Sequence, residues 1–171
     1  KLNFNNKLSL LKSLDEKPNK DWLKRINECE DEKVLKYFLK DLQNIGIENN
    51  SEILKILWEC CQIPDFVKKT YGHHIEVVSK VFKFLTGNNK KIPNQYMKEQ
   101  LSILDNLDGN VDSLTNRIAN VRTWAYVSNK SNWVENQDYW IERTKHLEDR
   151  LSDRLHEELT KTFIDKRASV L

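Results

Sequence analysis

Apolar residues recur at helical spacing along most of this chain, and no stretch alternates with period two for long enough to predict a strand. The clearest stripe lies within 31–43 and is formed by Val34, Leu35, Phe38, Leu39 and Leu42. Similar periodicity predicts helices over 51–61, 74–86, 94–107, 112–128 and 137–163. We therefore predict an all-α chain, an irregular bundle of about six to eight helices that ends in one long amphipathic helix.

Cap and breaker residues give the ends of these helices. Ser51 and Asp112 are candidate N-caps, because their side-chain oxygens can accept hydrogen bonds from the first free backbone N–H groups. Gly46 and Gly87 are typical helix stops, and Pro64 ends the helix that precedes it.

The run DNLDGN at 105–110 is the strongest turn signal in the sequence. It predicts a possible subdivision at 105–112, with one helical subdomain over 1–107 and a hairpin-like one over 108–171.

In the last helix, one line of residues is predicted to face inward, with steps of three or four positions. It consists of Trp140, Thr144, Leu147, Leu151, Leu155, Leu159 and Phe163. Intrahelical pairs of Asp149 with Arg150 and Arg154 are predicted to add modest support.

Composition limits the function classes. The chain has 171 residues, 39% hydrophobic and 32% charged, which is typical of a globular protein rather than a disordered one. No apolar run approaches the roughly 20 residues that span a bilayer, and no signal peptide is visible, so we expect a cytoplasmic protein without membrane contact. The formal net charge is only +2, so any binding to nucleic acid has to come from local clusters of cations.

No known catalytic or phosphate-binding motif is present: the sequence lacks GxxxxGK[ST], HExxH, CxxC and GxSxG. His156 beside Glu157, near Asp153, resembles an acid–base cluster, but on an exposed helical face we expect a solvated polar group. We therefore predict no catalytic residue, no cofactor site and no small-molecule substrate for this chain.

The cysteines and paired histidines do not point to a metal or a redox centre either. Cys29, Cys60 and Cys61 are odd in number and lack paired spacing, which favours reduced, buried thiols. His73 and His74 are adjacent, so their side chains diverge on a helix, and no further ligand lies at metal-binding spacing.

Aromatic and basic residues leave two interpretations open. Trp58, Trp124 and Trp140 lie on apolar faces, so core packing is favoured over base stacking, whereas Trp22 and Trp133 lie near the ends of predicted elements. Ordinary surface charge and a phosphate-contacting groove fit the basic residues equally well. The candidates for nucleic-acid binding are Arg117, Arg122, Arg143, Lys145, Lys161, Lys166 and Arg167.

Arg117 and Arg122 are five positions apart, which places them about 140° apart around a helix, so they cannot both face inward.

Several segments, taken in order, resemble one known family. DGNVDSLTNRIANVRTWAYVSN at 108–129, NW at 132–133 and EDRLSDRLHEELTKTFIDKRASVL at 148–171 are similar to the C-terminal helical region of bacterial superfamily-2 ATP-dependent helicases. The subgroup is related to the mitochondrial RNA-degradosome helicase. LWECCQIPDF at 57–66 and KKIPNQY at 90–96 fit the same region in the same order, whereas residues 1–50 resemble it only weakly.

The resemblance implies a helical accessory region, spanning 1–171, that braces two RecA-like motor domains and helps to wall a channel for single-stranded RNA or DNA. ATP and Mg²⁺ would bind in those motor domains, and a chain that begins at Lys1 without an initiator methionine is expected to be a piece of such a polypeptide. The alternative is a helical protein–protein interaction scaffold that does not contact nucleic acid.

The resemblance carries over no catalytic residue. The positions that match the family signature are expected mainly to fix helix packing and docking: Asn116, Arg117, Arg122, Thr123, Trp124, Asn129, Glu148, Asp149, Ser152, Asp153, His156, Glu157, Asp165 and Arg167.

Overall fold

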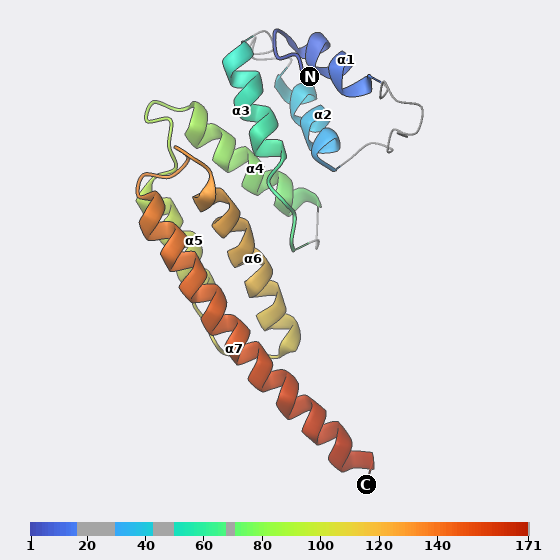
Figure 1. Ribbon diagram of the computed structural model, residues 1–171, viewed down its shortest axis with the longest axis vertical. Coiled ribbons are helices and arrows are strands. Elements are labelled where there is room, and N and C mark those ends of the chain that lie inside the picture. The colour runs from blue at the N-terminus through green and yellow to red at the C-terminus, as the bar shows by residue number, and fades with distance from the viewer. Residues whose placement is uncertain (17–29, 43–49, 68–70, 171) are drawn as a thin grey trace. The chain divides into compact units, whose positions relative to one another are not determined.

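The computed structural model describes residues 1–16, 30–42, 50–67 and 71–170 (Figure 1). Over these residues the chain is all-α, as predicted, and contains no strand. A single isolated β-bridge joins Ile92 to Val134. The seven helices are α1 (Lys7–Asp15), α2 (Glu30–Leu42), α3 (Ser51–Cys61), α4 (Tyr71–Thr86), α5 (Asn94–Leu104), α6 (Val111–Asn129) and α7 (Gln137–Val170).

The contacts divide the chain into two compact units. The first comprises Lys1–Ile63 and Gly72–Asn88, and the second comprises Pro64–Tyr71 and Asn89–Leu171. The segment 105–112, where the sequence suggests a subdivision, lies inside the second unit and joins α5 to α6. The units therefore divide at other positions.

In the first unit, α2 packs against α3. The predicted stripe of α2 is buried at Val34, Leu35, Phe38 and Leu39, whereas the side chain of Leu42 lies outside the described residues, as does Gly46.

Sequence periodicity did not predict α1, because Leu10 is the only residue of this short helix that is fully buried. The Asn6 side chain caps it by accepting a hydrogen bond from the Ser9 backbone N–H at 2.8 Å.

Two predicted caps are wrong by one or two positions. Asn50, not Ser51, caps α3 and accepts hydrogen bonds from the N–H groups of Glu52 and Ile53. Asn110, not Asp112, caps α6 by accepting from the Ser113 N–H at 2.9 Å. Asparagine caps as well as serine or aspartate does, so neighbouring candidates compete and the one that keeps an extended backbone becomes the cap.

Other helix boundaries also differ from the predicted ones. α2 begins at Glu30, α4 begins at Tyr71 rather than 74, and α5 ends at Leu104 rather than 107. α7 continues to Val170, well beyond the predicted end at 163.

In the second unit, α6 and α7 form a helical hairpin, with α5 packed on α6 (Figure 1). The Ile92 N–H donates to the Trp133 carbonyl at 2.7 Å, which fixes the chain before α5 to the turn between α6 and α7. Trp124, Trp133 and Trp140 are all buried here, whereas Trp58 in the first unit is half-buried and Trp22 lies outside the described residues.

The predicted inward line of α7 is correct only for its first half. Trp140, Thr144, Leu147 and Leu151 are buried, but Leu155 is half-buried, and the side chains beyond it are mainly exposed, with Leu159 at 47% and Phe163 at 62%. α6 has 19 residues and α7 has 34, so the hairpin covers only the first part of α7, which extends beyond α6 in Figure 1. Every residue from Leu159 to Ser169 is exposed, on all faces of the helix.

This difference in burial along α7 makes a matched pair of substitutions informative. Leu147→Ala, which removes a fully buried side chain, is expected to lower the free energy of unfolding by about 2–5 kcal/mol. Leu159→Ala is expected to change it by only about 0.5 kcal/mol. Urea unfolding followed by tryptophan fluorescence measures both, because three buried tryptophans lie in the same unit. Equal effects of the two substitutions would contradict the burial pattern.

Candidate functional site

The seven candidate cations fall into two groups. Arg117, Arg122 and Arg143 bond to other groups of the protein. The side chains of the other four, all on α7, are exposed and make no hydrogen bond or ion pair with any residue that the structure describes: Lys145, Lys161, Lys166 and Arg167.

Arg117 stabilises the turn before α6. Its Nη1 donates to the backbone carbonyls of Asn106, at 2.8 Å, and Asp108. Gly109 in the same turn has φ +127°, a conformation that other residues rarely adopt, and a Cβ there would lie 3.0 Å from that of Ser113. The guanidinium therefore braces a turn whose conformation requires glycine at position 109.

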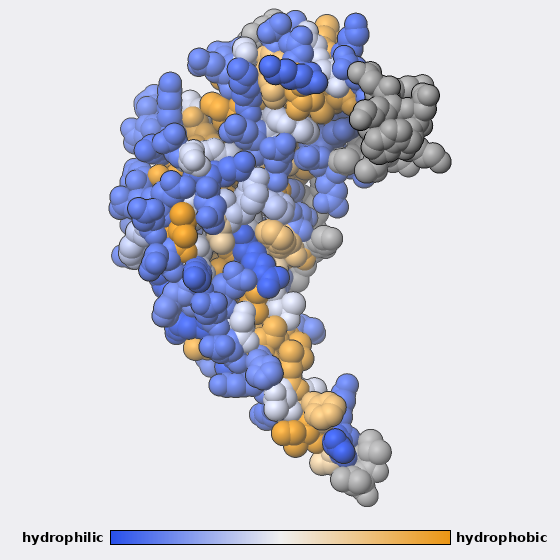
Figure 2. Space-filling view, in the orientation of Figure 1, coloured by the Kyte–Doolittle hydropathy of each residue, from blue (hydrophilic) through white to orange (hydrophobic). Residues whose placement is uncertain are grey.

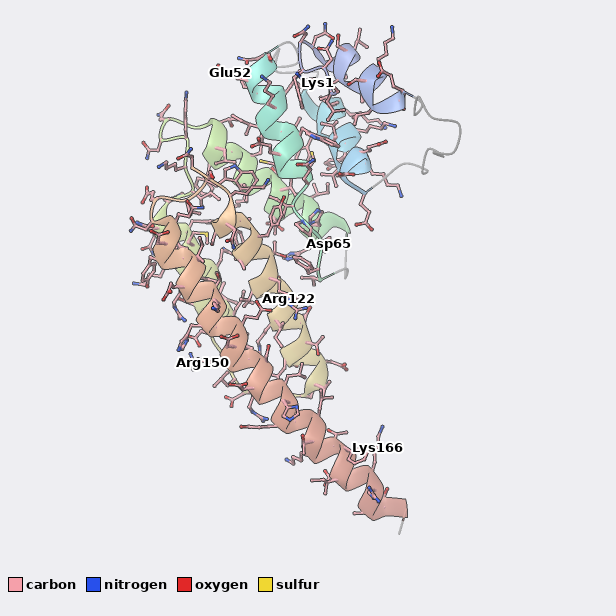
Figure 3. The ribbon with its side chains drawn as sticks, in the orientation of Figure 1. Lys1, Glu52, Asp65, Arg122, Arg150 and Lys166 are labelled. Carbon is pink, nitrogen blue, oxygen red and sulfur yellow. The ribbon has the colours of Figure 1, made fainter. Side chains whose placement is uncertain are left out.

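Arg122 joins the two long helices of the second unit. Its Nε donates to Oε1 of Glu148 at 2.8 Å, from α6 to α7. The Arg122 side chain is 54% exposed, so this ion pair contributes about 0–1 kcal/mol to stability. Figure 3 labels Arg122 on α6 and Arg150 on α7.

Asp105 connects α7 to the end of α5. Its two carboxylate oxygens accept hydrogen bonds from Arg143 Nη2 at 2.8 Å and from Arg150 Nη1 at 3.0 Å. The hydrogen bond from Arg143, with the charge of Arg150 adding to it, holds the pKa of Asp105 below its ordinary value of 3.8. The structure thus assigns Arg143 a role within the fold.

Sequence reasoning missed Asp105. Its partners lie 38 and 45 positions away, so no spacing in the sequence indicates the cluster. The predicted pairing of Asp149 with Arg150 and Arg154 is also wrong, because Arg150 bonds to Asp105 and Arg154 bonds to Glu158 at 3.1 Å.

The second half of α7 carries an exposed apolar pair, Leu159 and Phe163, which are one helical turn apart and 47% and 62% exposed. Ile164, which is 59% exposed, lies about 140° around the helix from Leu159. Figure 2 shows apolar side chains gathered along this end of the helix. Charges of both signs surround them, with Glu157 and Asp165 beside the exposed cations Lys161 and Lys166. This surface is therefore amphipathic and not a continuous positive track.

The polar group predicted at His156 and Glu157 is exposed, together with Asp153. Other members of the signature bond within their own helix: Thr123 Oγ1 donates to the Ala119 carbonyl, and Asn129 Nδ2 to the Ala125 carbonyl.

The two cysteine thiols that the structure describes are buried. Cys60 and Cys61 are both buried, as predicted for at least one of them, and Cys29 lies outside the described residues. Burial raises the pKa of the Cys61 thiol well above its ordinary value, and the neighbouring Cys60 and the charge of Asp31 raise it further.

In the part of the chain that the structure describes, no three His, Cys, Asp or Glu side chains converge as metal ligands would. His74 is buried in α4 and His73 beside it is exposed. Of the described helices, none combines the length and the apolar character that crossing a membrane requires.

No family model, curated protein or solved structure matches this chain. The resemblance to helicase C-terminal regions therefore stays a prediction.

The Asp105 cluster predicts a pH dependence. Because folding lowers the pKa of Asp105, its stabilisation is complete above the unfolded value near 3.8 and is lost as the pH falls through the lower folded value. Asp105→Asn should reduce stability by about 1 kcal/mol at pH 7 and flatten the loss of stability between about pH 5 and pH 2. Urea titrations across that range measure both effects.

Asp149→Asn is the matched control, because Asp149 is exposed and makes no bond to any described residue. It should leave the acid dependence unchanged. If the free energy of unfolding of Asp105→Asn changed with pH in parallel with that of the parent protein, the role of the cluster would be contradicted.

Proposed function

We propose that this chain is a non-catalytic helical module of an ATP-dependent helicase, and that the second half of α7 docks onto the RecA-like motor domains of the same polypeptide. The observation that best supports docking is the exposed pair of Leu159 and Phe163 at the end of a helix whose first half buries its apolar face against α6. The choice of partner rests on the family resemblance of 52–171.

Physical chemistry supports contact with a protein surface. Burying apolar surface gains roughly 25 cal/mol per Å², and the Leu159 and Phe163 side chains, about half exposed, lie one helical turn apart. Exposed charges of both signs flank them, which matches the apolar core and polar rim of protein–protein interfaces. A clustered, polar-rimmed apolar surface is a feature of interaction sites.

Photo-crosslinking tests the docking directly. With benzoylphenylalanine in place of Phe163 in the complete gene product, we expect crosslinks to the RecA-like domains. The same replacement at Ile103, which is 73% exposed on α5, is the matched control and should give none. Crosslinking at both positions, or at neither, would contradict the proposal. A complete gene product that lacks a GxxxxGK[ST] motor would contradict it as well.

Binding of a single strand of RNA or DNA is the second candidate function. The four exposed cations of α7 favour it, because their charged groups bond to no described residue and can contact phosphates. Figure 3 labels Lys166, which lies near the C-terminal end of that helix.

Salt dependence tests this candidate. Each phosphate contact contributes about −0.7 to the log–log slope for single strands, so replacing Lys145, Lys161, Lys166 and Arg167 with Gln should reduce the slope by up to about 3. Fluorescence anisotropy of a labelled oligonucleotide measures it. The matched control replaces four exposed lysines of the first unit, Lys33, Lys40, Lys55 and Lys83. Slopes that change equally in the two variants would contradict strand binding along α7.

A further inference from the structure

A cleft of about 430 Å³ lies inside the second unit, between the beginning of α5 and the beginning of α7. Asn94 and Lys98 line it from α5, and Asn136, Tyr139 and Arg143 line it from the other side. The volume lies within the range of about 300–1,000 Å³ that is typical of small-ligand sites.

Hydrogen bonds hold the two sides of the cleft together. Trp140 Nε1 donates to Asn94 Oδ1 at 2.8 Å, which joins α7 to the first residue of α5. The adjacent backbone hydrogen bond from Ile92 to Trp133 fixes the approach to α5. The cleft is therefore preformed by the fold.

The residues that line the cleft include two cations and no acid, and the ammonium group of Lys98 bonds to no residue that the structure describes. Two carboxylates lie at its edge: Glu135 Oε2 accepts from the Asn94 backbone N–H at 3.4 Å, and Glu99 Oε1 accepts from Gln95 Nε2 at 3.0 Å.

Arg143 shares the single carboxylate of Asp105 with Arg150, so one negative charge offsets only one of two positive charges. The α7 N-terminus adds a partial positive charge at Asn136. These groups favour an anion with phosphate-like charge.

An aromatic surface lies beside these cations. The Tyr139 side chain is 58% exposed, and its ring lies edge-on to that of Trp140, with 4.7 Å between the centroids. One large ring thus remains available for stacking by a planar heterocycle. The side-chain amides of Asn94 and Asn136 offer donors and acceptors for the edge of such a ring.

We propose that this cleft binds one nucleoside monophosphate group, with the base against Tyr139 and the phosphate at Lys98 and Arg143. The group is either a free nucleotide or one residue of a single strand, since both present the same chemistry. This inference does not rest on docking by the second half of α7.

Nuclear magnetic resonance titrations test it. Addition of AMP should shift the Trp140 indole signal and the side-chain amide signals of Asn94 and Asn136. Lys98→Gln and Tyr139→Ala should each weaken binding at least about tenfold, the ratio that 1.4 kcal/mol produces. The matched controls, Lys145→Gln on α7 and Tyr37→Ala in the first unit, should leave binding unchanged.

Two further probes separate the sources of the ligand. Shifts with AMP and with an adenosine hexanucleotide indicate a site open to both, and shifts with the hexanucleotide alone indicate a strand residue. The nucleoside assignment would be overturned if inorganic phosphate gave shifts as large as those with AMP and if Tyr139→Ala had no effect on binding. If no probe caused shifts at about 10 mM, the cleft would not bind even with a Kd near that value, and the proposed site would be wrong. Replacing Phe163 with Ser leaves these shifts in place whether or not α7 docks.

Discussion

The unequal lengths of α6 and α7 determine what α7 can do. A helix buries its apolar face only where another element packs against it, and α6, with 19 residues, covers only the first part of the 34 residues of α7. Trp140, Thr144, Leu147 and Leu151 lie in the covered part and belong to the core of the second unit. Leu159 and Phe163 lie beyond it, so the same apolar repeat that folds the first half of α7 leaves an apolar surface on the second half.

The basic residues also fall into two groups: some bond within the fold, and others keep their charged groups exposed at the surface. A guanidinium that bonds to carbonyls or a carboxylate of its own protein has to lose those bonds before it can contact a phosphate, at about 1.5–3 kcal/mol for a charged hydrogen bond. Arg117 Nη1 is in that position, at the turn before α6. Arg143 bonds to Asp105 through Nη2 alone and keeps its other N–H donors. The side chains of Lys161 and Lys166 have no such bonds to described residues. Positive charge that is available to a partner therefore lies on α7 and at Lys98 on α5.

Periodicity predicted the helical class and the buried stripe of α2, because both depend on residues three or four positions apart. It could not predict the roles of single polar residues. Asp105 reaches its partners across 38 and 45 positions, and the cleft joins Asn94 to Trp140 across 46, so these features exist only after the chain has folded. The position of a cap depends on which of several neighbouring polar residues keeps an extended backbone, and Asn50 and Asn110 illustrate this choice.

The length of α7 separates the two surfaces on which the proposals rest. Tyr139 and Phe163 are 24 positions apart on one continuous helix, which corresponds to about 36 Å along its axis. The two surfaces therefore share no residue, and a nucleotide at the beginning of α7 would not contact the side chains that dock on its second half. A docked α7 would also fix the position of the cleft relative to its partner, because one unbroken helix carries both. On a motor domain, such a module would hold a nucleotide site at a constant distance from the surface that anchors it.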